Sequence, residues 1–260
     1  MELNLTGKTA IVTGASRGIG LAIVQALAAE GVRVAGVART TTPELKDSGA
    51  YPVQADLSTA DGVASAMDTA LAELGGVDLL VNNVGGGDDI HLAGFLDVDD
   101  ATWTRVLDIN LFSAVRASRV LLPSLIERRG SIVNVSSINS RLPAVAPVAY
   151  AAAKAALAAL GKSLAEEFGP RGVRVNTVSP GVVRTAIWTD PDSIGSTAAA
   201  ASGMDHATFL DRIPEAFGIT TGRITEPAEV AALIAFLLSD VAGNITGADY
   251  VIDGGTLKTL

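Results

Sequence analysis

Tyr150 and Lys154 are the pair of side chains in this sequence with the clearest chemical potential. They lie four residues apart in an Ala-rich stretch that is predicted to be helical, so both side chains share one face of the helix. A phenol with an ordinary pKa of about 10 is a poor acid or base at neutral pH, but a neighbouring ammonium favours the phenolate and lowers that pKa. The pair could therefore exchange a proton with a carbonyl or alcohol oxygen. Taken alone, the spacing favours the alternative of a packed tyrosine and a solvated lysine.

Ser137 strengthens the case for chemistry. It lies thirteen residues before Tyr150 and just beyond a predicted strand that ends at Val135. Ligands of open α/β sheets bind at the carboxyl ends of the strands, where a hydroxyl can hydrogen-bond a substrate oxygen as charge develops on it. The adjacent Ser136 is the alternative. Asn110 lies in an otherwise apolar stretch, where a buried amide needs partners and would tie two backbone segments together.

A glycine-rich turn, TGASRGIG at residues 13–20, lies between the first predicted strand and the first predicted helix. Gly14, Gly18 and Gly20 allow the backbone to turn tightly and to approach a pyrophosphate. The helix N-terminus then offers N–H groups and the positive end of its dipole. The alternative is a plain strand–helix turn without a ligand.

The elements that must position these residues alternate between strands and helices. Apolar runs predict strands near residues 9–12, 32–37, 51–55, 79–82, 131–135, 173–178 and 248–252. Helices are expected over 18–30, from a Ser58 cap to about 74, over roughly 99–129, and over 148–168 and 227–238, with only a helical stub near Pro43. This order predicts one Rossmann-type α/β domain over residues 1–260, a doubly wound parallel sheet with helices on both faces. The long interruption at about 186–222 predicts a mobile lid over the substrate, with a plain surface insertion as the alternative.

Together these motifs resemble the short-chain dehydrogenase/reductase family over nearly the whole chain. Asp56-Leu57 is similar to the pair that holds the adenine, and Pro180-Gly181 followed by Thr185 is similar to the segment that holds the nicotinamide carboxamide. The run at 82–85 resembles an Asn-Asn-Ala-Gly motif, with valine in place of the usual alanine. The predicted cofactor-binding residues are Gly14, Ser16, Arg17, Gly18, Ile19, Gly20, Arg39, Asp56, Leu57, Asn83, Val84, Gly85, Tyr150, Lys154, Pro180, Gly181, Val183 and Thr185.

The resemblance also implies a catalytic set and an assembly. Asn110, Ser137, Tyr150 and Lys154 match the family's catalytic residues. Asn110 would support a water that links Lys154 to solvent, and Lys154 would also bind the nicotinamide ribose. In the family the Ala-rich helix and its predecessor form a four-helix contact between subunits, so we expect a homodimer or homotetramer; burial of the alanines within one subunit is the alternative.

The end of the second predicted strand indicates NADP(H) as the cofactor. NAD-binding relatives place an acid there for the ribose 2′-hydroxyl, but this chain has Ala38 followed by Arg39. Arg39 and Arg17 could pair with a 2′-phosphate through their guanidinium groups. A solvated loop arginine is the alternative for Arg39.

Composition excludes several other functions. The chain of 260 residues carries a formal net charge of −9, which disfavours nucleic acid and anionic membrane surfaces as partners. It has no cysteine, and its two histidines, His91 and His206, lack metal-ligand spacing, so no metal site is expected. No run of 18 uninterrupted apolar residues and no signal-peptide pattern occur, so we expect no membrane span and a cytoplasmic location.

The sequence therefore predicts an NADP(H)-dependent ketone reductase or alcohol dehydrogenase acting on a small molecule. Residues 86–96, 139–148 and 186–222 should border the substrate and offer mostly apolar side chains, among them Ile90, Leu92, Trp188, Phe209 and Phe217. One alternative is a 3-oxoacyl-carrier reductase, with Arg128, Arg129 and Arg171 docking an acidic carrier. A non-catalytic dinucleotide-binding regulator is less compatible with the full catalytic set. A nucleotide-sugar epimerase would need a C-terminal domain for which the residues after 252 leave no room.

Overall fold

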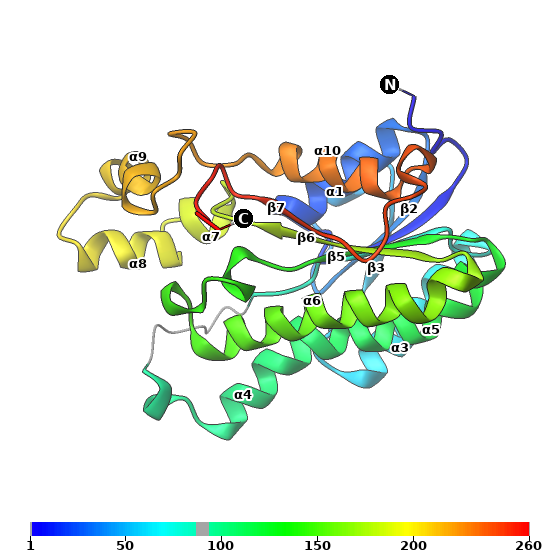
Figure 1. The fold of residues 1–260 in the computed structure, drawn as a ribbon, viewed down its shortest axis with the longest axis horizontal. Helices are drawn as coiled ribbons and strands as arrows, with labels where there is room; N and C mark the ends of the chain where they lie inside the picture. Colours follow the sequence, from blue (N-terminus) through cyan, green and yellow to red (C-terminus); the bar gives the residue numbers. More distant parts are fainter. Residues whose placement is uncertain (1, 87–93, 260) are drawn as a thin grey trace.

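A single parallel sheet forms the centre of the molecule. The computed structural model describes residues 2–86 and 94–259, and within them seven strands follow the order β3-β2-β1-β4-β5-β6-β7 (Figure 1). All neighbouring strands pair in parallel, and the order reverses between β1 and β4, where open α/β sheets bind their ligands. The strands are β1 (Thr9–Thr13), β2 (Arg33–Ala38), β3 (Tyr51–Gln54), β4 (Leu79–Asn82), β5 (Ser131–Val135), β6 (Arg174–Pro180) and β7 (Asp249–Ile252).

Helices cover both faces of this sheet. Figure 1 shows α1 (Gly18–Ala29) and α10 (Pro227–Leu238) above it, and α3 (Ala60–Leu74), α5 (Ser113–Glu127) and α6 (Val148–Phe168) below it. Each layer has its own apolar core, since β1 sends Val12 to the first layer and Ile11 to the second. This alternation along a buried strand explains why the strands read as continuous apolar runs. The remaining α-helices are α2 (Pro43–Asp47), α4 (Asp100–Leu107), α7 (Ala186–Thr189), α8 (Ile194–Ala201) and α9 (His206–Ala216).

Shorter helical turns link several of these elements. A π-helical segment, Asp108–Phe112, joins α4 to α5 without a break. Single 3₁₀ turns occupy Phe95–Asp97, Ile138–Ser140, Pro143–Val145, Gly169–Arg171 and Asp240–Ala242.

The predicted doubly wound parallel sheet is confirmed, and most element limits agree within one or two residues. The predicted cap of α3 is wrong by one position. Thr59 is the N-cap, and its Oγ1 accepts the Gly62 N–H at 3.0 Å, whereas the Ser58 hydroxyl donates to Asp56 Oδ1 at 2.8 Å. Ser58 is therefore engaged with the carboxylate of the predicted adenine motif and contributes to that turn.

The segment 186–222, which we call the lid, contains α7, α8 and α9 where the sequence suggested an irregular interruption. Figure 1 shows α8 and α9 beyond one end of the sheet. The lid helices pack on a small core that they share with Val182 and Ile224 on either side of the lid. Trp188 and Phe217 meet edge to face against this core, with centroids 5.7 Å apart. The caps Ser193 and Asp205 were the available signals for α8 and α9, because each accepts a backbone N–H three residues later.

One continuous helical run, Asp100–Glu127, is long and apolar enough to cross a membrane by length and composition alone. It comprises α4, the π segment and α5, and it packs against α3 and α6 in the described part of the chain. An ion pair between Arg116 and Asp108 at 2.8 Å lies within this run. The apolar side chains of the run thus pack within the helical layer that covers one face of the sheet.

Candidate active site

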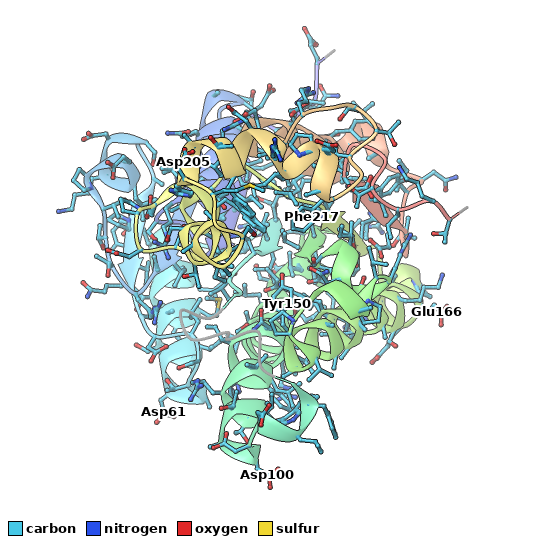
Figure 2. All side chains as sticks on the ribbon, turned by 90° about the vertical axis from the view of Figure 1, so that its left-hand side faces the viewer. Asp61, Asp100, Tyr150, Glu166, Asp205 and Phe217 are labelled. Carbon is cyan, nitrogen blue, oxygen red and sulfur yellow. The ribbon has the colours of Figure 1, made fainter. Side chains whose placement is uncertain are left out.

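The Tyr150, Lys154 and Ser137 side chains converge at the carboxyl end of β5. The helical spacing places the Lys154 Nζ 5.7 Å from the centroid of the Tyr150 ring. Ser137 lies two residues beyond the end of the strand and hydrogen-bonds the Tyr150 phenol. The backbone N–H of Asn139 donates to Ser137 Oγ at 3.2 Å, and Ser137 Oγ contacts Asn139 Oδ1 at 3.0 Å. Figure 2 looks onto this end of the molecule and shows Tyr150 near its centre, with Phe217 of the lid above it.

The side-chain amine and the backbone carbonyl of Lys154 are both hydrogen-bonded to consecutive residues at the end of β5. Its Nζ donates to the Val135 carbonyl oxygen at 2.9 Å, while the Ser136 hydroxyl donates to the Lys154 carbonyl oxygen at 2.9 Å. The side chain is buried, with only 3% of it exposed. Desolvation of the ammonium lowers the pKa of Lys154 to about 8. The residue is therefore mostly charged at neutral pH but loses its proton far more readily than an exposed lysine.

Burial also governs Tyr150, but in the opposite direction. The low-polarity surroundings raise the pKa of the Tyr150 phenol, and the hydrogen bond with Ser137 offsets part of that rise. In the protein by itself, the expectation of a lowered phenol pKa is thus wrong in sign, because desolvation of the phenolate outweighs the favourable neighbours. A protonated phenol at neutral pH is the form that can donate a proton to a carbonyl oxygen.

Asn110 joins the π segment to the backbone after β4. Its Oδ1 accepts the Gly86 N–H at 2.8 Å, and its Nδ2 donates to the carbonyl oxygens of Gly86 at 3.1 Å and Val106 at 3.0 Å. These contacts match the structural interpretation of this amide, and the water-supporting role stays a prediction. A Cβ added at Gly85 would lie 2.7 Å from Lys154 Nζ and 2.9 Å from Asn110 Oδ1. Gly85 is therefore the point at which both polar groups approach the chain closely.

The glycine-rich turn has the features of an anion-binding helix start. Gly14 and Gly18 both adopt positive φ, at 69° and 56°, which favours glycine. A Cβ at Gly20 would lie 2.0 Å from the Gly14 carbonyl oxygen, so the turn closes only without a side chain there. Helices α3, α4, α8 and α9 begin with a side-chain cap, whereas Arg17, the N-cap residue of α1, makes no capping side-chain hydrogen bond to the described residues. The first N–H groups of α1 are thus available for a phosphate.

Asn83 fastens this turn to the neighbouring strand. Its Nδ2 donates to the carbonyl oxygens of Thr13 at 2.9 Å and Gly14 at 3.2 Å. The buried Thr13 hydroxyl in return accepts the N–H groups of Asn83 and Val84, each at 3.0 Å. These residues therefore hold the turn in shape. Thr13 was missed by the sequence reasoning, although a hydroxyl at the end of a buried strand was a usable signal.

The predicted adenine and 2′-phosphate residues lie together at the ends of β2 and β3. Ala38 ends β2, and its carbonyl oxygen accepts the Ala55 N–H at 3.0 Å. Hydrogen bonds from the backbone and side chain of Ser58 hold the pKa of Asp56 below its ordinary value, and the charge of Arg39 adds to this effect. The Arg39 side chain is exposed, and its charge acts on this carboxylate. The structure thus brings Arg39 to the edge at which a 2′-phosphate was predicted.

Several predicted cofactor residues can contribute only through their backbone. Leu57 and Val183 are at most 5% exposed, and their side chains belong to the two cores. Ile19 is partly buried against the first core. Thr185, in contrast, lies beside the glycine turn, since a Cβ at Gly18 would come within 3.1 Å of its Cγ2.

The other members of the predicted cofactor set lie near these residues. Ser16 accepts the Thr42 hydroxyl through its carbonyl oxygen at 2.9 Å. Pro180 ends β6, and Gly181 follows with its N–H donated to the Ile252 carbonyl oxygen at 2.9 Å. All lie at the carboxyl-terminal edge of the sheet, where the sequence placed them.

The predicted substrate segments differ from expectation in one respect. Trp188, Phe209 and Phe217 all pack against the lid core, and Trp188 also contacts Phe217, so these rings are not simply presented to a substrate. Ile90 and Leu92 lie outside the described residues, which end at 86 and resume at 94. The apolar character predicted for the substrate accordingly loses part of its basis.

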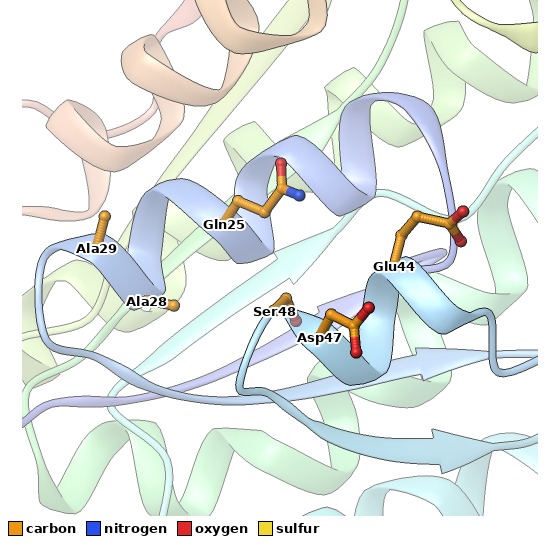
Figure 3. A pocket seen from close by; sticks show the side chains of 6 residues that line it. All are labelled: Gln25, Ala28, Ala29, Glu44, Asp47 and Ser48. Carbon is orange, nitrogen blue, oxygen red and sulfur yellow. The ribbon is translucent and has the colours of Figure 1, made fainter.

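A shallow groove elsewhere on the molecule is unrelated to this site. It lies between α1 and α2 and is lined by Gln25, Ala28, Ala29, Glu44, Asp47 and Ser48 (Figure 3). It contains none of the predicted site residues. The polar cluster at the strand ends is therefore the better candidate for catalysis.

Two further residues shape the site beyond the predicted set. Ser136 was the alternative to Ser137 as the hydroxyl for the substrate oxygen, but its hydroxyl donates to the Lys154 carbonyl oxygen instead. Asn139 orients the Ser137 hydroxyl and also donates to the Leu142 carbonyl oxygen at 3.3 Å. The spacing Ser-x-Asn after a strand was a possible signal for Asn139, because such side chains bond to the backbone two residues away.

Comparison with known proteins agrees with this geometry. The family model described as enoyl-(acyl carrier protein) reductase matches residues 14–256. A 3-alpha-(or 20-beta)-hydroxysteroid dehydrogenase of Mycobacterium bovis is 36% identical, with 100% of this chain and 93% of the relative covered. A 3-oxoacyl-[acyl-carrier-protein] reductase of Vibrio cholerae is 34% identical, with 97% and 98% covered. The structure of an L-sorbose reductase from Gluconobacter frateurii, in complex with NADPH and L-sorbose, aligns with a TM-score of 0.91 at 31% identity, with 100% of both chains covered.

This chain belongs to the short-chain dehydrogenase/reductase family. The three proteins named above are a hydroxysteroid dehydrogenase, a 3-oxoacyl-[acyl-carrier-protein] reductase and an L-sorbose reductase, and all have nearly the same identity to this chain. Similarity therefore shows the family and its oxidoreductase chemistry and does not select among these substrates.

Proposed function

We propose that this protein is an NADP(H)-dependent oxidoreductase that interconverts a ketone and an alcohol, with Tyr150 as the proton donor in the reductive direction. The observation that carries the proposal is the buried ammonium of Lys154, anchored on the Val135 carbonyl beside the Tyr150 ring. Burying a charge is costly, and buried groups with strongly perturbed pKa values cluster at functional sites. Here the buried ammonium lies next to the phenol that hydrogen-bonds Ser137.

The side chains of the site supply proton transfer and charge stabilisation. When bound, reduced nicotinamide supplies the hydride that the carbonyl carbon accepts. Ser137 donates a hydrogen bond to the carbonyl oxygen, and Tyr150 Oη gives that oxygen its proton. The Lys154 ammonium stabilises the phenolate that remains, and a proton from solvent then restores the phenol. In alcohol oxidation the same phenolate accepts the proton.

The choice of NADP(H) rests on the end of β2. The strand ends in the small Ala38, which offers no carboxylate to a ribose 2′-hydroxyl, and the exposed Arg39 follows. The uncapped start of α1 supplies N–H groups for the pyrophosphate. The solved relative bound to NADPH supports the same choice.

Carrier docking through the predicted arginines is disfavoured by their location. Arg128 and Arg129 lie between α5 and β5, and Arg171 lies between α6 and β6, at the amino ends of strands and opposite the Tyr150 end of the sheet. Arg128 also contacts Asp78 at 3.5 Å. We therefore favour a free ketone over a carrier-bound 3-oxoacyl thioester as the substrate.

The lid and the subunit contact complete the proposal. We propose that residues 186–222 close over the substrate and exclude water, within one domain that spans residues 1–260. The alanines of α6 were expected either to form a subunit contact or to be buried within one subunit. Ala151 and Ala153 are buried within the chain, whereas Ala152, Ala155 and Ala159 are exposed. The exposed three leave a smooth surface for a homodimer or homotetramer, which light scattering after size-exclusion chromatography would measure. We further propose a cytoplasmic location.

A carbonyl panel tests the activity. L-Sorbose, a 3-ketosteroid and a 3-oxoacyl thioester would each be offered with NADPH and with NADH, and cofactor oxidation followed by absorbance. We expect turnover with NADPH on at least one free ketone, and a loss of about 10²–10⁴-fold in Tyr150→Phe. Binding of NADPH to that variant, followed by fluorescence, should be nearly unchanged. A Tyr150→Phe enzyme with wild-type turnover, in a reaction limited by chemistry, would show that another group is the acid.

A further inference from the structure

We infer that residues 253–258, which we call the strap, hold the return end of the lid, and that Lys258 is a positioning residue for the substrate-binding side of the enzyme. The strap follows β7 and crosses the segment 218–222, through which the lid returns to the sheet. The inference stands on contacts within the chain and goes beyond the proposed function, on which only its kinetic test rests.

Lys258 joins the end of the lid to the strap through three oxygen atoms, two in the lid and one in the strap itself. Its Nζ donates to the Gly218 carbonyl oxygen at 3.0 Å, to Thr220 Oγ1 at 2.7 Å and to the Gly255 carbonyl oxygen. Gly218 follows directly on α9, whose C-cap is Phe217. A cation at this position satisfies carbonyl groups beyond the last helical turn and interacts favourably with the negative end of the helix dipole.

The backbones of the strap and the lid interlock at two glycines. Thr221 N–H donates to the Gly254 carbonyl oxygen at 3.0 Å, and the Thr220 hydroxyl donates to the Gly255 carbonyl oxygen at 2.9 Å. Both glycines have positive φ, at 63° and 82°. A Cβ at Gly254 would lie 2.6 Å from Ile219 Cγ2, and one at Gly255 would lie 2.8 Å from Thr220 Oγ1. This contact therefore depends on two residues without side chains, as expected of a close crossing and not of a loose tail.

The near end of the strap is anchored at the edge of the candidate active site. Asp253 is 7% exposed, and its two carboxylate oxygens accept the N–H groups of Gly255 at 2.8 Å and Leu257 at 2.7 Å. Gly181 packs against it, since a Cβ at Gly181 would lie 2.8 Å from Asp253 Cβ. One short segment thus contacts both the chain that follows β6 and the end of the lid.

The lid core connects the residues that Lys258 holds to the candidate active site. Ile219 lies between two lid residues held by Lys258 and belongs to the core that contains Trp188 and Phe217. Trp188 follows closely on Thr185, which lies beside Gly18 in the glycine turn. Lys258 therefore acts on the site through the lid core and does not touch the reacting atoms. We expect residues 218–222 to stay fixed to the strap while the helices of the lid close over the substrate.

Hydrogen exchange on the cofactor-free protein tests the anchorage. In Lys258→Met and in Thr220→Val, amides of residues 205–222 should exchange at least tenfold faster than in the wild type, while those of α1 and α10 keep their rates. Lys258→Arg, which retains a cation, should stay within about threefold of the wild type. Lys162→Met is the matched control, because Lys162 is exposed on α6. Unchanged exchange over 205–222 in both Lys258→Met and Thr220→Val would overturn the inference.

Kinetics with NADPH and whichever panel ketone is turned over separates positioning from general stability. We expect Lys258→Met to raise KM for the ketone about fivefold or more, with kcat and the Kd of NADPH within about twofold of the wild type, and Lys258→Arg to restore KM. A fall in kcat at unchanged KM would refute the positioning role. If the wild type fails to bind NADPH, the proposed function fails, whereas the exchange experiment still decides the role of the strap.

Discussion

Replacing Lys154 with methionine should make the protein more stable at neutral pH while abolishing the proposed activity. Burial lowers the pKa of this lysine from 10.5 to about 8. At about 1.4 kcal/mol per pH unit, the charged form is about 3 kcal/mol less favourable in the folded protein than in the unfolded chain. Methionine removes that cost but also removes the hydrogen bond to the Val135 carbonyl, which contributes about 1 kcal/mol. The net expectation is a gain of about 2 kcal/mol in the free energy of unfolding at pH 7.

The pH dependence of this gain follows from the direction of the pKa change. Below pH 8 both the folded and the unfolded wild type carry the proton, so the folded state bears the full cost of the buried charge. Between pH 8 and 10.5 the folded state releases the proton and the unfolded chain keeps it, so the stability contribution of Lys154 rises with pH. The advantage of Lys154→Met should therefore shrink across this window and vanish near pH 10.

Urea denaturation of the cofactor-free protein at pH 7, 8.5 and 10 measures these differences. Lys162→Met on the same helix is the matched control, since Lys162 is 60% exposed and its pair with Glu166 is a surface contact. Its effect should stay within about 0.5 kcal/mol at each pH. A Lys154→Met protein that is less stable than the wild type at pH 7, or whose advantage is the same at pH 10, would show that burial does not strain this ammonium.

Further outcomes follow from the cofactor edge, the glycine contacts and the same lysine. Arg39→Ala should raise KM for NADPH about tenfold or more and leave KM for NADH nearly unchanged, because one charge-assisted phosphate contact is lost. Arg33→Ala, at the other end of β2, is the control. Equal wild-type efficiency with both cofactors would contradict the assignment. Gly85→Ala should lower turnover at least tenfold, since its Cβ would displace the Lys154 amine. Gly169→Ala is the control, because a Cβ there would meet open space and should leave turnover unchanged. Near-normal turnover in Gly85→Ala would show that the position of the amine is not critical. In a chemistry-limited assay, ketone reduction should weaken as pH rises through 8 and Lys154 loses its charge, and a flat profile from pH 6.5 to 9.5 would argue against its electrostatic role.

The local elements and the order of the motifs could be predicted from the sequence. Alternation of short Val- and Ile-rich runs with longer helical stretches is enough to specify a parallel sheet, and the limits of β4, β5, α6 and α10 agree residue for residue. The shared face of Tyr150 and Lys154 follows from helical periodicity alone. The family resemblance then supplied the expected roles, because roles depend on groups that come from distant parts of the chain.

Only the tertiary structure decided the contacts that give these residues their chemistry. A carbonyl at the end of β5 holds the Lys154 amine, and no side-chain pattern reveals which backbone oxygen will be available. Burial, which depends on every neighbouring element, set the direction of the Tyr150 pKa against the local expectation. Packing between residues far apart in the chain also brought Trp188 against Phe217 and Lys258 onto the end of α9. Periodicity and capping act within a few residues of the chain, whereas desolvation and packing are properties of the assembled fold.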